Sequence, residues 1–234
     1  MPDFQGRRIV LTGVSRGIGL VCAKALLEQG AAVLGVGRDS ERLNRAIQEL
    51  SQLGDFAALR VDVGSPSAAA LIAEVVEQRW GGLDVLVNNA AVMDWRADFE
   101  AEEPEILEQT LRVNLIAPHR LILALLPMLR KSVTPRIVNM SSGAGTFSSL
   151  CGGPEGASYK LSKYALNGLT VLYAGMLRGT VAVNSLDPGW LKTDMGGPNA
   201  PGEVDEGAKR LLALLRQPAS ESGKFWLGEY EMKF

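Results

Sequence analysis

Short apolar runs alternate with longer segments of helical pattern along almost the whole chain, and this alternation constrains the fold more than any other feature. An apolar run of roughly four to eight residues between turn residues is typical of a strand buried on both faces. Strands that alternate with helices form a parallel sheet with helices on both sides. The predicted strands are Arg8–Thr12, Ala32–Val36, Phe56–Val61, Leu83–Val87, Arg136–Met140, Val181–Leu186 and Gly223–Leu227. The sequence therefore predicts an α/β fold, a doubly wound parallel sheet of about seven strands.

The segments between these strands predict the helices. They are Leu20–Gln29, Ser40–Leu50, Ser65–Trp80, Pro104–Leu129, Ala157–Leu177 and Val204–Arg216. Ser40 is the candidate N-cap of the second helix, and Pro66 is placed to occupy the first turn of the third. No linker and no internal repeat interrupts the pattern, so residues 1–234 are expected to form a single domain.

The composition excludes several classes of protein. A formal net charge of -2 implies no basic surface for nucleic acid. Cys22 and Cys151 have no metal-ligand spacing, so we expect no metal and no disulfide. The single histidine, His119, and the lack of a Gly-x-Ser-x-Gly motif argue against a Ser–His–Asp hydrolase. The N-terminus is polar and the apolar stretch Leu121–Leu129 is too short to span a membrane, which predicts a soluble, cytoplasmic protein without a membrane partner.

A glycine motif connects the first predicted strand to the first helix. Gly13 permits a tight turn, Gly17 lets the backbone approach a pyrophosphate, and Gly19 lets the helix pack closely on the strand. The N-terminus of the following helix offers free N–H groups and a positive dipole end to phosphates. The alternative is a glycine-rich turn without a ligand, but the strand and helix on either side favour a dinucleotide site.

Basic residues near this motif indicate which dinucleotide binds. A unit that prefers NAD usually carries an acidic residue after the second strand to hold the ribose hydroxyls. This chain has Gly37 in that place and Arg38 next, and Arg16 lies inside the glycine turn. A guanidinium suits a 2′-phosphate, so both arginines predict NADP (NADPH), unless they are solvated surface charges. Asp62, after the third strand, is either a contact for the adenine amino group or a turn-capping aspartate.

Ser142, Tyr159 and Lys163 are the candidates for proton transfer. Tyr159 and Lys163 are four residues apart, so a helix places both side chains on one face. An ammonium close to a phenol lowers the tyrosine pKa from its usual value of ~10, by at most about three units. The alternative is a solvated helix pair. Ser141, directly before Ser142, competes with it for the role of the acting serine.

Further polar and small residues follow other strands. Asn88-Asn89-Ala90-Ala91 lets the backbone pass close to a flat ring. Asn114, within an apolar helix, is either a satisfied core amide or a kink whose carbonyl orders a water. A Pro188-Gly189 turn with Thr193 behind it is placed to wall a nicotinamide. Nearly all of these motifs fall at carboxyl ends of predicted strands, where ligands bind in open α/β sheets.

In order and spacing, these motifs resemble the short-chain dehydrogenase/reductase family over almost the whole chain, with Ala91 as a departure where the family most often has glycine. The run Pro188–Pro198 resembles the carbonyl-reductase-like branch, which favours NADPH. The resemblance implies a Rossmann-type fold and a nicotinamide-dependent oxidoreductase. It also implies that Tyr159 is the acid/base, Ser142 orients the carbonyl, Lys163 binds ribose hydroxyls and lowers the tyrosine pKa, and Asn114 holds a relay water. The expected cofactor-binding residues are Gly13, Ser15, Arg16, Gly17, Ile18, Gly19, Arg38, Asp62, Val63, Asn89, Ala90, Ala91, Tyr159, Lys163, Pro188, Gly189 and Thr193.

The resulting hypothesis is NADPH-dependent reduction of an aldehyde or ketone, with Tyr159 as the proton donor. The alternatives are an alcohol dehydrogenase working in the oxidative direction and a catalytically idle dinucleotide-binding regulatory protein. Besides Ser142, the candidate substrate contacts are Met93, Trp95 and Trp190, with Phe147 and Met195 as further apolar candidates. The resemblance allows a homodimer or homotetramer through the helices that start near Pro104 and Ala157, and does not exclude a monomer.

Overall fold

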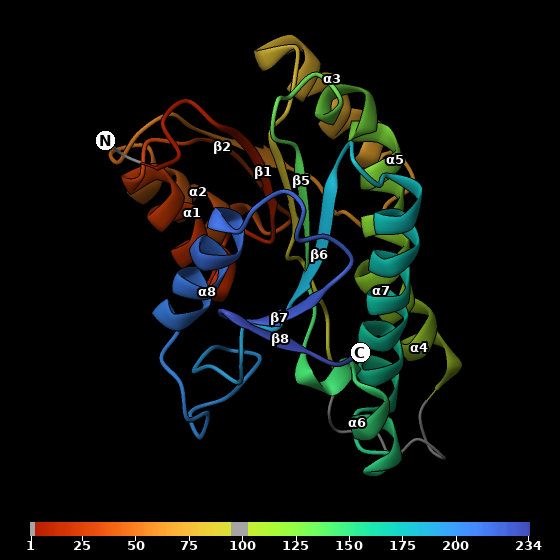
Figure 1. Cartoon of the computed structure of the whole chain (residues 1–234). Coiled ribbons are helices and arrows are strands. Elements are labelled where there is room, and N and C mark those ends of the chain that lie inside the picture. Colours follow the sequence, from red (N-terminus) through yellow and green to blue (C-terminus); the bar gives the residue numbers. More distant parts are fainter. Residues whose placement is uncertain (1–2, 95–102) are drawn as a thin grey trace.

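The computed structural model describes residues 3–94 and 103–234. Its centre is one sheet of eight strands in the order β3-β2-β1-β4-β5-β6-β7-β8 (Figure 1). The neighbouring strands from β3 through β7 are parallel, and β8 pairs antiparallel with β7. The strands are β1 (Arg8–Thr12), β2 (Ala32–Gly37), β3 (Phe56–Arg60), β4 (Val85–Asn88), β5 (Arg136–Met140), β6 (Ala182–Leu186), β7 (Phe225–Leu227) and β8 (Tyr230–Met232). The predicted doubly wound parallel sheet is confirmed.

Helices cover both faces of this sheet. They are α1 (Gly17–Glu28), α2 (Ser40–Leu50), α3 (Ala68–Trp80), α4 (Pro104–Leu111), α5 (Ala117–Leu129), α6 (Phe147–Cys151), α7 (Ala157–Met176) and α8 (Asp205–Arg216). One core contains buried side chains of α1, α2 and α8, and a second contains those of α3, α5 and α7. Figure 1 shows these two groups of helices on opposite sides of the strands.

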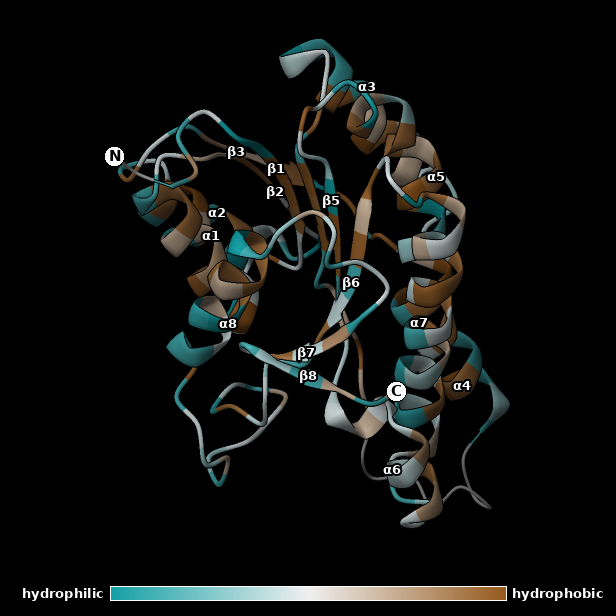
Figure 2. Ribbon diagram, in the orientation of Figure 1, coloured by the Kyte–Doolittle hydropathy of each residue, from teal (hydrophilic) through white to brown (hydrophobic). Residues whose placement is uncertain are grey.

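The sequence of β1 explains why the sheet lies between two cores. Ile9 and Leu11 belong to the core beneath α1 and α8, whereas Val10 points to the opposite core. All three are fully buried, and Figure 2 shows the neighbouring central strands in the brown of hydrophobic residues. Burying such a side chain contributes roughly 1.5–3 kcal/mol. The order of the strands reverses between β1 and β4, so a crevice opens there at the carboxyl ends.

The structure adds a strand and a short α-helix that the sequence did not predict. Strand β8 follows Gly228, whose φ of +62° permits the reversal after β7. Helix α6 lies in the loop between β5 and α7 and begins after Thr146, whose hydroxyl accepts a hydrogen bond from the Ser149 N–H. The sheet therefore has eight strands rather than about seven.

Helix α2 begins at Ser40 as predicted, and α1 begins at Gly17 rather than at Leu20. The predictions for the N-cap of α2 and for the start of α3 were wrong. The N-cap of α2 is Asp39 and not Ser40, because the Asp39 carboxylate accepts a hydrogen bond from the Arg42 N–H at 3.0 Å. Helix α3 begins at Ala68 and not at Ser65, so Pro66 precedes the helix. At both places the polar residues near the boundary allow more than one start.

A π-helical segment, Arg112–Ile116, separates α4 from α5. The Ala117 N–H bonds to the Arg112 carbonyl, five residues earlier. Pro118 has no N–H to offer the Asn114 carbonyl four residues earlier, so that carbonyl lacks the usual α-helical donor.

By length and composition, the continuous helix Pro104–Leu129 could cross a membrane, but half of its apolar window is buried inside the fold and a core helix passes the same test.

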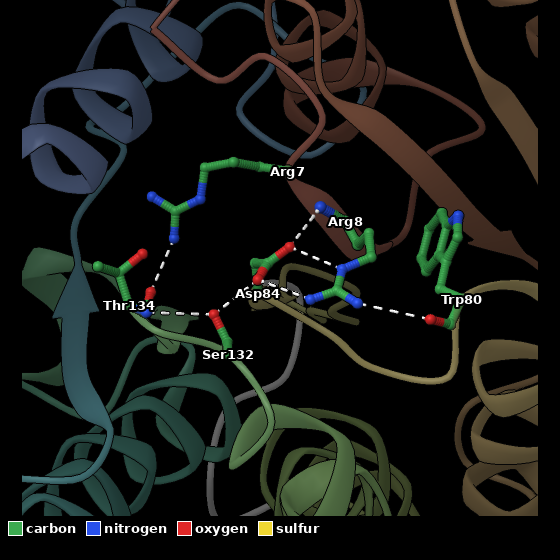
Figure 3. Close-up of polar contacts among 6 residues, drawn as sticks. All are labelled: Arg7, Arg8, Trp80, Asp84, Ser132 and Thr134. Carbon is green, nitrogen blue, oxygen red and sulfur yellow. Dashed lines mark hydrogen bonds and ion pairs between the residues drawn. The ribbon is translucent and has the colours of Figure 1, made fainter.

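An ion-pair network joins elements at the amino edge of the sheet, opposite the crevice (Figure 3). The Arg8 guanidinium donates to both carboxylate oxygens of Asp84, at 2.9 and 3.0 Å. The Ser132 hydroxyl donates to the same carboxylate at 2.6 Å. Burial by itself would raise the pKa of Asp84, but these hydrogen bonds outweigh it and lower the pKa to about 2.

Candidate active site

A cleft lies across the carboxyl ends of the strands, where the crevice was expected. Among the residues proposed from sequence, it is lined by Gly13, Ser15, Arg16, Gly17, Ile18, Gly19, Arg38, Asp62, Val63, Asn89, Ala90, Ala91, Tyr159, Lys163, Pro188 and Thr193. Gly189 lies beside this lining in the turn that contains Pro188. The lining also includes Ser141, the alternative candidate for the acting serine, and residues that sequence analysis did not select, among them Val92, Met140 and Asp194. The cleft thus collects segments from all along the chain at one edge of the sheet.

The glycine turn needs its small residues for close packing. Gly13 has φ +74°, and a Cβ there would lie 2.8 Å from the Asn89 Nδ2. A Cβ on Gly19 would lie 2.1 Å from the Gly13 carbonyl oxygen. Gly17 has φ +55° and opens α1, so the free N–H groups of the first turn face the cleft end of the sheet. This backbone cradle suits a pyrophosphate group.

Asn89 and Thr12 fix the turn to β4. The Asn89 amide donates to the Thr12 carbonyl at 2.8 Å. The backbone N–H groups of Asn89 and Ala90 donate to the Thr12 hydroxyl at 2.9 and 3.0 Å. These bonds hold the glycine turn and the Asn88–Ala91 segment side by side, which makes one wall of the cleft.

Asn114 is a buried amide whose side chain is satisfied. Its Oδ1 accepts from the Val92 N–H and its Nδ2 donates to the Val92 carbonyl, both at 2.9 Å. The same Nδ2 donates to the Ser162 hydroxyl at 3.0 Å. The side chain therefore anchors the π segment to α7 and to the irregular segment that follows β4, and the backbone carbonyl of Asn114 is left without an α-helical donor.

Tyr159 and Lys163 lie on the inner face of α7, as their spacing predicted. Tyr159 is 8% exposed and Lys163 is 3% exposed. The Lys163 ammonium lies 5.6 Å from the centre of the Tyr159 ring and donates to the Met140 carbonyl at 2.7 Å. Ser142 follows β5 and makes a side-chain hydrogen bond with Tyr159. The three side chains form one hydrogen-bonded and electrostatically coupled group.

The pKa of Tyr159 differs from the sequence prediction. Burial raises the pKa to about 12, although the hydrogen bond with Ser142 acts in the opposite direction. Burial also lowers the pKa of Lys163 to about 8. The sequence predicted a lowered tyrosine pKa because it considered the lysine charge without the loss of water around both groups. In the protein alone, Tyr159 holds its proton at neutral pH.

Two further polar residues lie here: Asp187, which sequence analysis did not assign to the site, and Ser141, which it left as the alternative to Ser142. Asp187, at the end of β6, is 7% exposed, and its carboxylate accepts from the N–H groups of Gly143 and Gly189 at 2.9 and 2.8 Å. Ser141 is 3% exposed and lines the cleft, and its hydroxyl has no hydrogen-bond partner within the described protein. A polar residue directly after a strand of buried residues is the signal that marks both positions in the sequence.

The two arginines proposed for a phosphate differ in their contacts. Arg38 is exposed at the rim of the cleft. Arg16 forms an ion pair with Asp194, and Arg42 of α2 approaches the same carboxylate at 3.4 Å. Several guanidinium groups therefore gather at the rim beside the glycine turn, and the carboxylates of Asp194 and Asp39 partly neutralise their charge.

Of the apolar substrate contacts proposed from sequence, the described residues Met93, Phe147 and Trp190 do not line the cleft, whereas Met195 does. Met93 is half-buried and Trp190 is 61% exposed, with its indole N–H donating to the Gly196 carbonyl at 2.8 Å. Phe147 is exposed, and Met195 lines the cleft. Trp95 lies outside the described residues.

Comparison with known proteins agrees with this architecture. The model of the short chain dehydrogenase family matches residues 7–203. The (+)-neomenthol dehydrogenase of Arabidopsis thaliana is 29% identical over 97% of both chains. The NADPH-bound carbonyl reductase from chicken fatty liver is 30% identical, with a TM-score of 0.91 over 99% of this chain and 100% of that one. The Pseudomonas aeruginosa RhlG/NADP complex is 31% identical, with a TM-score of 0.85 over 97% of each chain. The chain belongs to the short-chain dehydrogenase/reductase family, and its structural neighbours place it with the carbonyl-reductase-like members.

Proposed function

We propose that this protein is an NADPH-dependent reductase of an aldehyde or ketone, in which Tyr159 donates the proton to the carbonyl oxygen. The observation that carries the proposal is the hydrogen bond between Tyr159 and Ser142, with the Lys163 ammonium 5.6 Å from the tyrosine ring, in the same cleft as the glycine turn. A proton donor, a second hydrogen-bond donor and a dinucleotide cradle are the parts that carbonyl reduction needs.

The cleft fits a nicotinamide dinucleotide. The positions of Gly13 and Gly19 have no room for a Cβ, which leaves backbone exposed toward a pyrophosphate. The unpartnered Ser141 hydroxyl lines the same cleft and offers a polar contact to a ribose or carboxamide. Arg38 and Arg16 supply the charge for a 2′-phosphate, and similar proteins have been solved with NADPH and NADP bound.

Bound NADPH supplies the hydride. Ser142 donates a second hydrogen bond to the substrate carbonyl oxygen, beside Tyr159, and stabilises the negative charge that develops on that oxygen. The raised pKa of Tyr159 keeps the phenol protonated, as a proton donor for carbonyl reduction must be. Lys163 holds its ammonium near the phenol and the ribose site. The Asn114 carbonyl, which Pro118 leaves without an α-helical donor, is the candidate to hold a water that returns the proton to Tyr159.

We also propose that two copies of the chain associate through α5 and α7. Exposed apolar side chains gather on these helices, including Leu123, Leu172 and Met176, which are 51%, 73% and 60% exposed. The Tyr173 hydroxyl meets His119 Nδ1 at 2.8 Å and links the two helices. The single sheet and the family match over residues 7–203 support a one-domain enzyme.

Replacement of Tyr159 with Phe tests the catalytic assignment. The change removes only the hydroxyl, so we expect turnover to fall by roughly 10²- to 10⁴-fold while NADPH still binds. Turnover is measured as NADPH oxidation with a panel of aldehydes and ketones, and binding as NADPH fluorescence. Tyr164→Phe, on the outer face of the same helix, is the control and should keep its rate. Near-normal turnover of Tyr159→Phe with any good substrate would remove the assignment. Binding of NADPH without turnover of any substrate by the wild type would favour the idle regulatory protein.

A further inference from the structure

One carboxylate connects the two loops that form the reactive end of the cleft. Asp187 Oδ2 accepts from the Gly143 N–H at 2.9 Å, next to Ser142. Its Oδ1 accepts from the Gly189 N–H at 2.8 Å, in the turn that contains Pro188. The backbone N–H of Asp187 donates to the Trp226 carbonyl at 2.7 Å, which fixes the residue against β7. The position of Ser142 relative to the Pro188–Gly189 wall therefore depends on this side chain.

The ionisable and charged groups around Asp187 come from two helices. Tyr159 and Lys163 of α7 both interact with its charge. Arg210 of α8 donates to the Pro188 carbonyl at 2.7 Å and pairs with Glu206. Lys163 has no carboxylate within salt-bridge distance among the described residues, and Asp187 is the carboxylate whose charge acts on its ammonium from further away.

The Asp187 charge acts on both reactive groups in the same direction. Burial lowers the pKa of Lys163, and Asp187 opposes that change. Burial raises the pKa of Tyr159, and Asp187 raises it further. A carboxylate in this place therefore favours the state in which the tyrosine and the lysine both hold their protons.

The simplest alternative is a structural turn. In an Asp-Pro-Gly sequence, the side chain commonly accepts from the N–H two residues on, as the Gly189 contact does here. The Gly143 contact joins residues 44 positions apart in the sequence, so it is not part of that turn. A purely structural role would affect thermal stability, and would leave the protonation of Tyr159 unchanged.

We propose that Asp187 is a positioning residue of the active site, which holds the Ser142 loop against the Pro188–Gly189 turn and supplies the negative charge opposite Lys163 and Tyr159. This inference rests on the proposed reductase function. In this role, Asp187 keeps Tyr159 protonated, so that the tyrosine can donate its proton during reduction.

The test compares Asp187→Asn and Asp187→Ser with the wild type. Both variants are neutral and keep a group that accepts from the Gly189 N–H. The turnover number is measured against pH with saturating cofactor, for carbonyl reduction and for oxidation of the product alcohol. In the plot of turnover number against pH, one limb reflects the titration of Tyr159. We expect this limb to move about one pH unit toward lower pH in both directions of reaction. At a fixed pH on that limb, alcohol oxidation becomes about tenfold faster. Asp84→Asn, which removes a carboxylate at the opposite edge of the sheet, is the control and should leave the limb in place.

Three results would overturn the inference. The first is a pH profile of turnover that is unchanged in folded Asp187 variants that bind NADPH. The second is a shift of that profile in Asp84→Asn that equals the shift in the Asp187 variants. The third is a failure of both Asp187 variants to fold, which would make the residue a structural turn residue. The Tyr159→Phe experiment separates these outcomes from a failure of the proposed function, because an active Tyr159→Phe variant would remove the reductase assignment whatever the Asp187 variants do.

Discussion

Arg38 and Arg16 offer two guanidinium groups to the cleft, and their environments differ. Arg38 is exposed and has no ion pair among the described residues, whereas Arg16 is paired with Asp194. A free guanidinium binds a phosphate without first breaking an ion pair. We therefore expect Arg38 to contribute more than Arg16 to discrimination between NADPH and NADH.

Replacement of Arg38 with Ala should raise the KM for NADPH by roughly 10- to 100-fold, the effect of one lost charge-assisted contact, and leave the KM for NADH nearly unchanged. Steady-state kinetics with both cofactors measure the change. Arg60→Ala is the matched control, because Arg60 is an exposed arginine that donates to the Arg38 carbonyl and does not line the cleft. An equal rise in the KM for NADH would show that Arg38 does not bind the 2′-phosphate.

The sequence indicated single residues well where a local spacing carries the information. The interval between Tyr159 and Lys163 placed both on one helix face, and the glycine intervals matched a turn that has no room for side chains. The predicted direction of the Tyr159 pKa shift was wrong, because this pKa depends on burial by segments that are distant in the sequence. The contact between Asp187 and Gly143 likewise forms only when β5 and β6 pair, so no local sequence pattern predicts it.

Among the elements, the strands from β3 through β7 were predictable and the β8 edge of the sheet was not. A strand between two helix layers is apolar throughout, as β2 is, with every residue buried. Strand β8 has two exposed residues out of three, Tyr230 and Glu231, so its sequence has no such signature. The π segment also escaped prediction, although Pro118, four residues after Asn114, is a physical signal for the interrupted hydrogen bonding.

The Arg8–Asp84–Ser132 network joins the starts of β1 and β4 and the end of α5, and it predicts a pH-dependent stability. The pKa of Asp84 is about 2 in the folded protein, below its ordinary value of 3.8. Its stabilising contribution is therefore complete above about pH 4 and is lost as the pH falls toward 2. Asp84→Asn should lower the free energy of unfolding by about 2 kcal/mol at pH 7, with the difference closing on acidification.

Urea unfolding of the wild type and the variant between pH 7 and pH 3 measures this difference. Asp55→Asn is the control, because Asp55 pairs with Arg79 at the surface and an exposed pair contributes little. A constant gap between wild type and Asp84→Asn across the whole pH range would mean that the charge of Asp84 is not what stabilises the network.

At the scale of the whole molecule, the sheet separates two tasks. Its carboxyl edge collects the cleft residues from segments as far apart as Gly13 and Met195, and its amino edge carries the ion-pair network. The outer face of α5 and α7 serves neither task, yet it exposes Leu123, Leu172 and Met176. Large exposed apolar side chains on adjacent helices are typical of a surface that is covered in the assembled protein.

A second copy of the chain is the occupant that we propose for this face, so the wild type should have twice the 25.0 kDa mass of the chain in solution. Leu172→Glu places a charge in the centre of the contact, and desolvating an unpaired carboxylate there should convert the dimer to monomer. Light scattering after size exclusion measures the mass of each variant. Val133→Glu is the matched control, because Val133 is 97% exposed in the turn after α5, away from the proposed contact. A monomeric wild type, or dissociation in both variants, would contradict association through α5 and α7. A dimer that survives Leu172→Glu would place the contact on another face of the molecule.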